Sequence, residues 1–121
     1  MKILLAEDDP HVSMIMQLCL EKMGGHQTVV AEDGEVALKI AATQAFDLII
    51  LDGMMPKKAG VEVARELRAR GVTTPIIFLS AKNVEPQHLN LAWGYIAKPF
   101  EPTQICARID EILASRGVRA G

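Results

Sequence analysis

The segment Phe46-Asp47-Leu48-Ile49-Ile50-Leu51-Asp52 carries the clearest structural signal in the chain. Its four consecutive apolar residues, rich in branched side chains and bounded by polar ones, are typical of a strand buried on both faces of a parallel sheet. The run ends on Asp52, and the Gly-Met-Met-Pro sequence that follows predicts a loop. Ligands of open α/β sheets bind beyond the carboxyl ends of the strands, so Asp52 lies where a ligand would bind. An aspartate at this position can also be only a turn former or a helix N-cap. The rest of the sequence is needed to choose between these roles and ligand binding.

Length and composition restrict the class of protein. The chain has 121 residues, enough for one domain, and half of them are hydrophobic. The net charge of −2 without a basic run argues against nucleic acid or an anionic membrane as a direct partner. No apolar stretch approaches the roughly 20 residues of a membrane span, and the N-terminus lacks the length of a signal peptide. We therefore expect a cytoplasmic protein.

Short apolar runs alternate with helical patterns along the whole chain. The predicted strands are Lys2–Ala6, Thr28–Ala31, Leu48–Leu51, Ile76–Leu79 and Tyr95–Ala97. The predicted helices start at Pro10, with Asp9 as N-cap, and at Glu35, Gly60 and Pro102. Strands that alternate with helices through short loops predict a parallel sheet covered on both faces.

Helical spacing predicts which side chains face the core. They are Val12, Ile15, Met16, Cys19, Leu20 and Met23 in the first helix; Ala37, Ile40 and Ala41; Val63, Ala64 and Leu67; and Ile105, Ile109, Ile112 and Leu113. Cys19 and Cys106 fall on apolar helix faces, and we interpret them as core thiols because no CxxC or zinc spacing is present. His11, His26 and His88 share no spacing and are interpreted as surface or loop residues.

Polar residues with a common chemistry stand at the strand ends. They are Glu7 and Asp8, then Asp52, Ser80 and Lys98. In a parallel sheet these ends lie along one edge, where three carboxylates would repel each other without a cation. Lys98 supplies one positive charge, and Mg²⁺, which prefers hard oxygen ligands and often takes a phosphate oxygen, would supply two more.

Four motifs together resemble a known family. They are ILLAEDDP at 3–10, LDGMMPKKAG at 51–60, FLSA at 78–81 and YIAKPF at 95–100. As a set, and in this order, they resemble the receiver domain of two-component response regulators, of the CheY-like kind. The resemblance implies a flavodoxin-like, doubly wound five-stranded parallel sheet of order 2-1-3-4-5.

The resemblance also implies roles for the acidic residues. Asp52 would be the phosphoacceptor and would take a phosphoryl group from a phosphohistidine. Asp8 and Asp52 would hold Mg²⁺, with the backbone carbonyl of Met54 as a third ligand and with Glu7 acting through water. The domain would assist its own phosphotransfer and a slow dephosphorylation, and would not be an enzyme with a separate substrate.

The remaining implied roles concern contacts with the phosphoryl group and the output. Ser80 and Lys98 would contact the phosphoryl group, and Tyr95 would change rotamer when Ser80 moves. A sensor histidine kinase or a histidine phosphotransfer protein would be the donor, and a protein target would receive the signal.

The segment 82–94 departs from the family pattern. It is about one helical turn shorter than the family norm, and Pro86 interrupts it. We therefore expect a shortened or irregular fourth helix, with Trp93 folded back onto the domain.

We interpret residues 1–121 as a single receiver domain without an output domain. The alternative that the chain is a piece of a larger regulator stays open. The rival interpretation is a phosphorylation-independent, receiver-like adaptor, against which the complete set of strand-end residues argues. A small flavin-binding protein is a third alternative, but acids after the first strand would repel a flavin phosphate.

Overall fold

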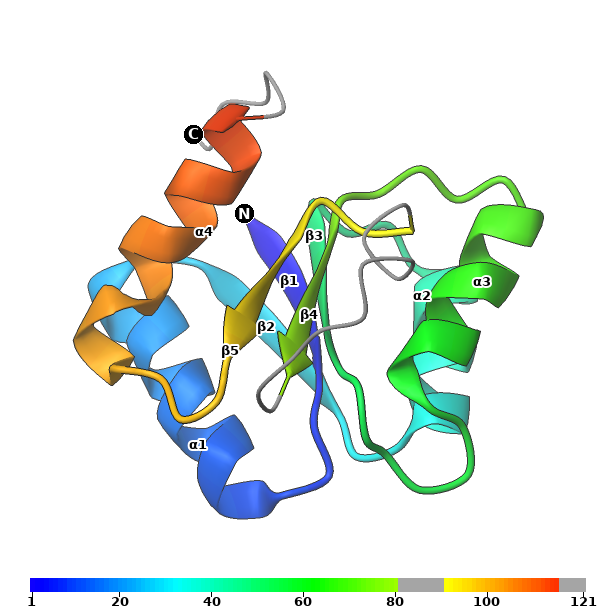
Figure 1. The fold of residues 1–121 in the computed structure, drawn as a ribbon, viewed down its shortest axis with the longest axis horizontal. Coiled ribbons are helices and arrows are strands. Elements are labelled where there is room, and N and C mark those ends of the chain that lie inside the picture. Colours follow the sequence, from blue (N-terminus) through cyan, green and yellow to red (C-terminus); the bar gives the residue numbers. More distant parts are fainter. Residues whose placement is uncertain (81–90, 116–121) are drawn as a thin grey trace.

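A five-stranded parallel sheet forms the centre of the protein (Figure 1). The computed structural model describes residues 1–80 and 91–115. Its elements are β1 (Lys2–Ala6), α1 (Pro10–Leu18), η1 (Cys19–Met23), β2 (Gln27–Ala31), α2 (Gly34–Thr43), β3 (Leu48–Asp52), α3 (Gly60–Ala69), β4 (Ile76–Ser80), β5 (Gly94–Ala97), η3 (Pro102–Gln104) and α4 (Ile105–Ser115). The strand order β2-β1-β3-β4-β5 confirms the predicted flavodoxin-like topology.

The central strand β3 is buried along its whole length, as its apolar run predicts. Its alternate side chains enter two separate cores. Leu48 and Ile50 join the core under α1 and α4, whereas Ile49 and Leu51 join the core under α2 and α3, on the other side of the sheet (Figure 1). Covering helices on both faces therefore explain why β3 has no polar residue before Asp52.

The predicted inward faces of α3 and α4 are confirmed, since all seven of their predicted core residues are buried. In α2 the prediction was partly wrong: Leu38 is buried and Ile40 is only half-buried. This helix starts one residue earlier than expected. The side chain of Asp33 caps it by accepting a hydrogen bond of 2.9 Å from the backbone N–H of Val36.

The predicted buried face of the first helix was wrong at Ile15 and Met23, which are 41% and 56% exposed. Asp9 caps α1 as expected, with Pro10 in its first turn. After Leu18, however, the helix continues as the π-helical turn η1. A π-helical turn holds more residues than an α-helical turn, so it rotates Met23 off the inward face that α-helical spacing predicts. Ile15 lies at the margin of that face.

The predicted irregular fourth helix falls largely on residues 81–90, which lie outside the described residues. From Leu91 the chain forms a turn and enters β5. The backbone N–H of Trp93 donates to the carbonyl of Ile76 at 2.7 Å, and its half-buried side chain packs on the core under α1 and α4. The expectation that Trp93 folds back onto the domain is confirmed.

Gly60, the first residue of α3, packs directly against the backbone of Asp52. A Cβ at this position would lie 2.3 Å from the Asp52 carbonyl oxygen. Alanine usually favours a helix over glycine, but here we expect Gly60→Ala to lower the free energy of unfolding by about 1–3 kcal/mol because the backbone under Asp52 must move. Urea denaturation measures this change.

Gly53→Ala is the matched control, since its Cβ would lie 3.7 Å from the Leu79 carbonyl oxygen, an ordinary contact. It should unfold close to the wild-type urea concentration. A Gly60→Ala variant as stable as Gly53→Ala would show that the close approach does not constrain Asp52.

Candidate functional site

The ends of four strands bring the predicted polar residues to one edge of the sheet. Glu7 follows β1, Asp52 ends β3 and Lys98 follows β5. Ser80 ends β4, where its backbone pairs with Ala97. The side chain of Ser80 lies outside the described part of the chain, so its contact with a phosphoryl group stays a prediction.

Lys98 joins two buried carboxyl groups. Its Nζ lies 2.7 Å from Glu7 Oε1 and 3.0 Å from Asp52 Oδ2. Glu7 is 2% exposed and Asp52 5%. Backbone amides hold the other two oxygens: Asp9 N–H donates to Glu7 Oε2 at 3.2 Å, and Met54 N–H donates to Asp52 Oδ1 at 3.1 Å. Every carboxylate oxygen of the pair thus has a donor, which fixes the orientation of both groups.

The electrostatics of the pair are unusual. Burial, together with the neighbouring Asp52, raises the pKa of Glu7 to about 7, against the lowering effect of Lys98. Burial alone would lower the pKa of Lys98, but its hydrogen bonds to Glu7 and Asp52 outweigh this effect and raise it. Lys98 therefore stays an ammonium at neutral pH, while Glu7 holds a proton for part of the time.

Three carboxyl groups could share a cation. Glu7, Asp8 and Asp52 each offer an oxygen, and these oxygens lie within 4.8 Å of one another. Asp8 is exposed, so the cluster opens to water. A set of hard oxygens with access to water fits Mg²⁺, which keeps several water ligands. The role of the Met54 carbonyl as a further ligand stays a prediction. The N–H of Met54 already donates to Asp52, and the Met54 side chain is 81% exposed.

The loop after Asp52 is anchored at both ends. Gly53 N–H donates to the carbonyl of Leu79 at 3.0 Å, and Gly60 N–H donates to the carbonyl of Gly53 at 3.2 Å. Within the loop, Lys57 has a positive φ of 69° and its Nζ lies 3.7 Å from the buried Asp33 carboxylate. These contacts hold the backbone of Asp52 and its neighbours in place.

Tyr95, the predicted switch aromatic, pairs with Phe78 in the register of β5 and β4. It is 37% exposed, at the outer strand of the sheet. Its predicted change of rotamer stays a prediction.

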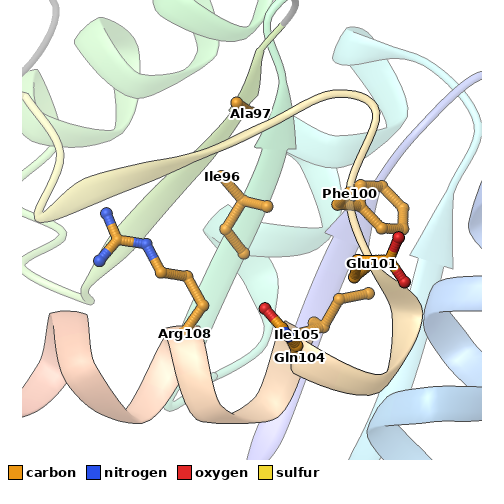
Figure 2. A pocket seen from close by; sticks show the side chains of 7 residues that line it. All are labelled: Ile96, Ala97, Phe100, Glu101, Gln104, Ile105 and Arg108. Atoms are coloured by element: carbon orange, nitrogen blue, oxygen red, sulfur yellow. The ribbon is translucent and has the colours of Figure 1, made fainter.

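A cavity of about 190 Å³ lies beside β5 and α4, and Glu7, Asp8 and Asp52 are not among the residues that line it. Buried Ile96 and Ile105 contribute apolar lining. Figure 2 shows Arg108 at one end of it, and Phe100 and Glu101 at the other. Only one carboxylate lines it, so it lacks the clustered acids that phosphoryl transfer with Mg²⁺ requires.

Sequence reasoning missed the backbone donors of the site. The N–H groups of Asp9 and Met54 orient Glu7 and Asp52. Every residue except proline carries such a donor, so residue types give no signal for them.

Comparison with known proteins identifies the family. The model of the response regulator receiver domain matches residues 3–110. The chain belongs to this family. It is 40% identical over 123 residues to the alkaline phosphatase synthesis transcriptional regulatory protein PhoP of Bacillus subtilis, covering 98% of this chain and 51% of that protein. It is 38% identical over 113 residues to the transcriptional regulatory protein DltR of Streptococcus agalactiae, covering 90% of this chain and 50% of that protein.

Solved receiver structures have the same fold. The receiver domain of the Francisella response regulator 1452 matches with a TM-score of 0.85 and 30% identity, over 95% of this chain and 98% of that one. The response regulator TrrA of Thermotoga maritima, in complex with Mg²⁺-BeF, matches with a TM-score of 0.83 and 31% identity, over 93% of this chain and 98% of that one.

This receiver chain spans about half the length of the curated relatives it matches. The expected lack of an output domain therefore stays a prediction. The expectation that nucleic acid is not a partner gains no support, because those relatives are transcriptional regulators by name. No helix within the described ranges has the length and apolar character of a membrane span.

The raised pKa of Glu7 makes the stability of the Mg²⁺-free receiver depend on pH. Between the ordinary value of 4.5 and about 7, the folded protein keeps a Glu7 proton that the unfolded chain has released. The free energy of unfolding therefore falls as the pH rises through this interval. Glu7→Gln lacks this titration, so we expect its stability relative to wild type to increase from pH 4.5 to 7. Denaturant titrations in chelator-treated buffer at several pH values measure the difference. A difference that is constant with pH, or that shifts toward wild type, would contradict the assignment.

Proposed function

We propose that this receiver domain is a phosphoacceptor of a two-component or phosphorelay pathway, and that Asp52 takes the phosphoryl group. The observation that carries the proposal is the Asp52 carboxylate, buried at the end of β3 and held by Lys98 Nζ at 3.0 Å. Phosphoryl transfer needs mostly positioning and charge neutralisation, and this carboxylate is positioned by two donors of fixed geometry.

The proposed reaction is an in-line displacement. An Asp52 oxygen forms a bond to phosphorus while the P–N bond of the donor phosphohistidine breaks, and the imidazole nitrogen keeps the electron pair. Lys98 lies beside the nucleophile and balances negative charge that gathers there. Glu7, Asp8 and Asp52, with the Met54 carbonyl, would hold Mg²⁺, which supplies positive charge to the phosphoryl oxygens. Ser80 would donate to the same oxygens.

A sensor histidine kinase or a histidine phosphotransfer protein is the proposed donor, and a protein target is the proposed recipient of the signal. The phosphoryl group brings a charge of roughly −1.5 to −2 to the edge of the sheet. Ser80 and Tyr95 would carry this change toward the outer strand β5, and the protein would act in the cytoplasm.

The rival function is an adaptor that keeps the receiver shape without phosphorylation. An adaptor needs no reactive carboxylate. Burying two acids around one lysine destabilises the fold, and an adaptor function does not explain why they are buried. A flavin-binding function is less well supported still, because Glu7 and Asp8 would face the flavin phosphate.

Phosphorylation with acetyl phosphate and Mg²⁺ tests the proposal directly. Intact-mass measurement should show one phosphoryl group on the wild type and none on Asp52→Asn, because the amide is not a comparable nucleophile. Asp8→Ala should label slowly and with a weakened dependence on Mg²⁺. Asp47→Asn is a matched control, since Asp47 is an exposed aspartate at the opposite end of β3. It should label like wild type, and an Asp52→Asn protein that labels at the wild-type rate would disprove the assignment.

The lifetime of the phosphoryl group should depend on Met54. Its side chain follows the site by two residues and is 81% exposed, and being apolar it offers no group that orients an attacking water. We expect slow self-dephosphorylation of the wild type and faster loss in Met54→Asn, whose amide can orient an attacking water. Decay of the phosphorylated mass after removal of acetyl phosphate measures both rates. Met54→Leu should keep the slow rate, and equal decay in Met54→Asn and Met54→Leu would refute this role.

A further inference from the structure

The loop of residues 53–59, which follows Asp52, rests on the start of helix α2. The loop joins the end of β3 to the start of α3, and α2 and α3 lie side by side on one face of the sheet (Figure 1). Gly34, the first residue of α2, donates its N–H to the carbonyl of Pro56 at 3.4 Å. A Cβ on Gly34 would lie only 1.9 Å from the carbonyl oxygen of Lys58. The loop therefore approaches α2 this closely only because residue 34 has no side chain.

The electrostatics at the start of α2 favour this contact. The first N–H groups of a helix have no partner within the helix and carry a partial positive charge, so carbonyl oxygens of the loop are stabilised beside them. Asp33 caps α2 with Oδ1, and its Oδ2 lies 3.7 Å from Lys57 Nζ. The Asp33 side chain is buried, so water screens this ion pair less than it screens a fully exposed one. Asp33 thus links the start of α2 to the middle of the loop.

The contact with α2 also restrains Met54, because the residues on both sides of it are held. Gly53 N–H donates to the carbonyl of Leu79, and Met55 packs against the core under α2 and α3. Met54 N–H itself donates to Asp52 Oδ1 at 3.1 Å. A shift of the loop away from α2 would therefore move the Met54 backbone relative to the Asp52 carboxylate.

We propose that Gly34 and the Asp33–Lys57 ion pair are positioning residues for the cation of the phosphoacceptor site. They hold the loop where the Met54 carbonyl and the Asp52 carboxylate can bind the same Mg²⁺, and they act through Met54 without touching the cation. The inference rests on the proposed function of this site. Residues that orient metal ligands in this way typically change metal affinity by about 10- to 100-fold when they are altered.

Binding of Mn²⁺, a paramagnetic substitute for Mg²⁺, tests the proposal in the whole chain, with free Mn²⁺ measured by electron paramagnetic resonance. Gly34→Ala should weaken Mn²⁺ binding by about tenfold or more, because the added methyl pushes the loop away from α2. It should also need more Mg²⁺ for half-maximal labelling by acetyl phosphate, and saturating Mg²⁺ should restore its rate toward that of the wild type. A residue that only stabilised the fold would not produce this separation.

Gly71→Ala is the matched control for a loss of stability. Gly71 has a φ of +83°, so alanine is strained there, but no atom of the described residues lies within 4 Å of the added Cβ. Gly71 follows α3, whereas the loop precedes it. This variant should unfold more easily than the wild type and keep the wild-type Mn²⁺ affinity.

Lys57→Gln separates positioning from a simple effect of charge. Removing a positive charge from the loop beside a cation site should by itself strengthen cation binding. Loss of the ion pair with Asp33 should instead loosen the loop and weaken Mn²⁺ binding by about two- to fivefold.

Wild-type Mn²⁺ affinity in Gly34→Ala would overturn the proposal. Unchanged or stronger Mn²⁺ binding by Lys57→Gln would equally overturn it, and this result counts even where Gly34→Ala does not fold. Phosphorylation keeps the two proposals apart, since a wild type that binds Mn²⁺ but takes up no phosphoryl group would overturn the proposed function alone.

Discussion

Two carboxyl groups buried side by side need a positive charge between them, and this need determines how the strand ends are arranged. Glu7 and Asp52 are almost fully buried, and Lys98 contacts both. Removing charges from water is unfavourable unless each is paired and hydrogen-bonded. Here one ammonium serves two carboxyl groups, and the raised pKa of Glu7 shows that the compensation is incomplete. A further cation would complete this compensation, and Asp8 adds an exposed carboxylate beside the pair.

The sheet makes this arrangement possible by bringing together residues that are far apart in the sequence. Ala6 pairs with Leu51 in the register of β1 and β3, so Glu7 and Asp52 follow side by side. The apolar body of β3, covered on both faces, supplies the rigid base. Gly60 allows the start of α3 to lie against Asp52. Stability from the two cores thus supports a strand end that is unfavourable on its own.

The sequence predicted the architecture well because the strands are short, apolar and separated by clear helices. The apolar run before Asp52 was enough to predict a buried parallel strand. Because the carboxyl ends of parallel strands share one edge of the sheet, the sequence also predicted that Glu7, Asp8, Asp52 and Lys98 lie together there. The strand order came from the family resemblance, since spacing alone does not distinguish possible orders.

Some features had no usable signal in the sequence. The π-helical turn η1 depends on the hydrogen-bond pattern of the backbone, so α-helical spacing misplaced Met23. The pairing of Lys98 with Glu7 as well as Asp52 depends on side-chain conformation.

A double-mutant cycle between Lys98 and Glu7, measured as free energies of unfolding at neutral pH without Mg²⁺, shows most directly whether Lys98 is the counter-ion of the buried carboxyl groups. If Lys98 is the counter-ion of a buried pair, Lys98→Met should be strongly destabilising, and adding Glu7→Gln should recover part of the loss. The two changes should then be coupled by about 1–3 kcal/mol. Strictly additive effects would contradict this role of Lys98, because they would mean that it does not hold the buried carboxyl groups together.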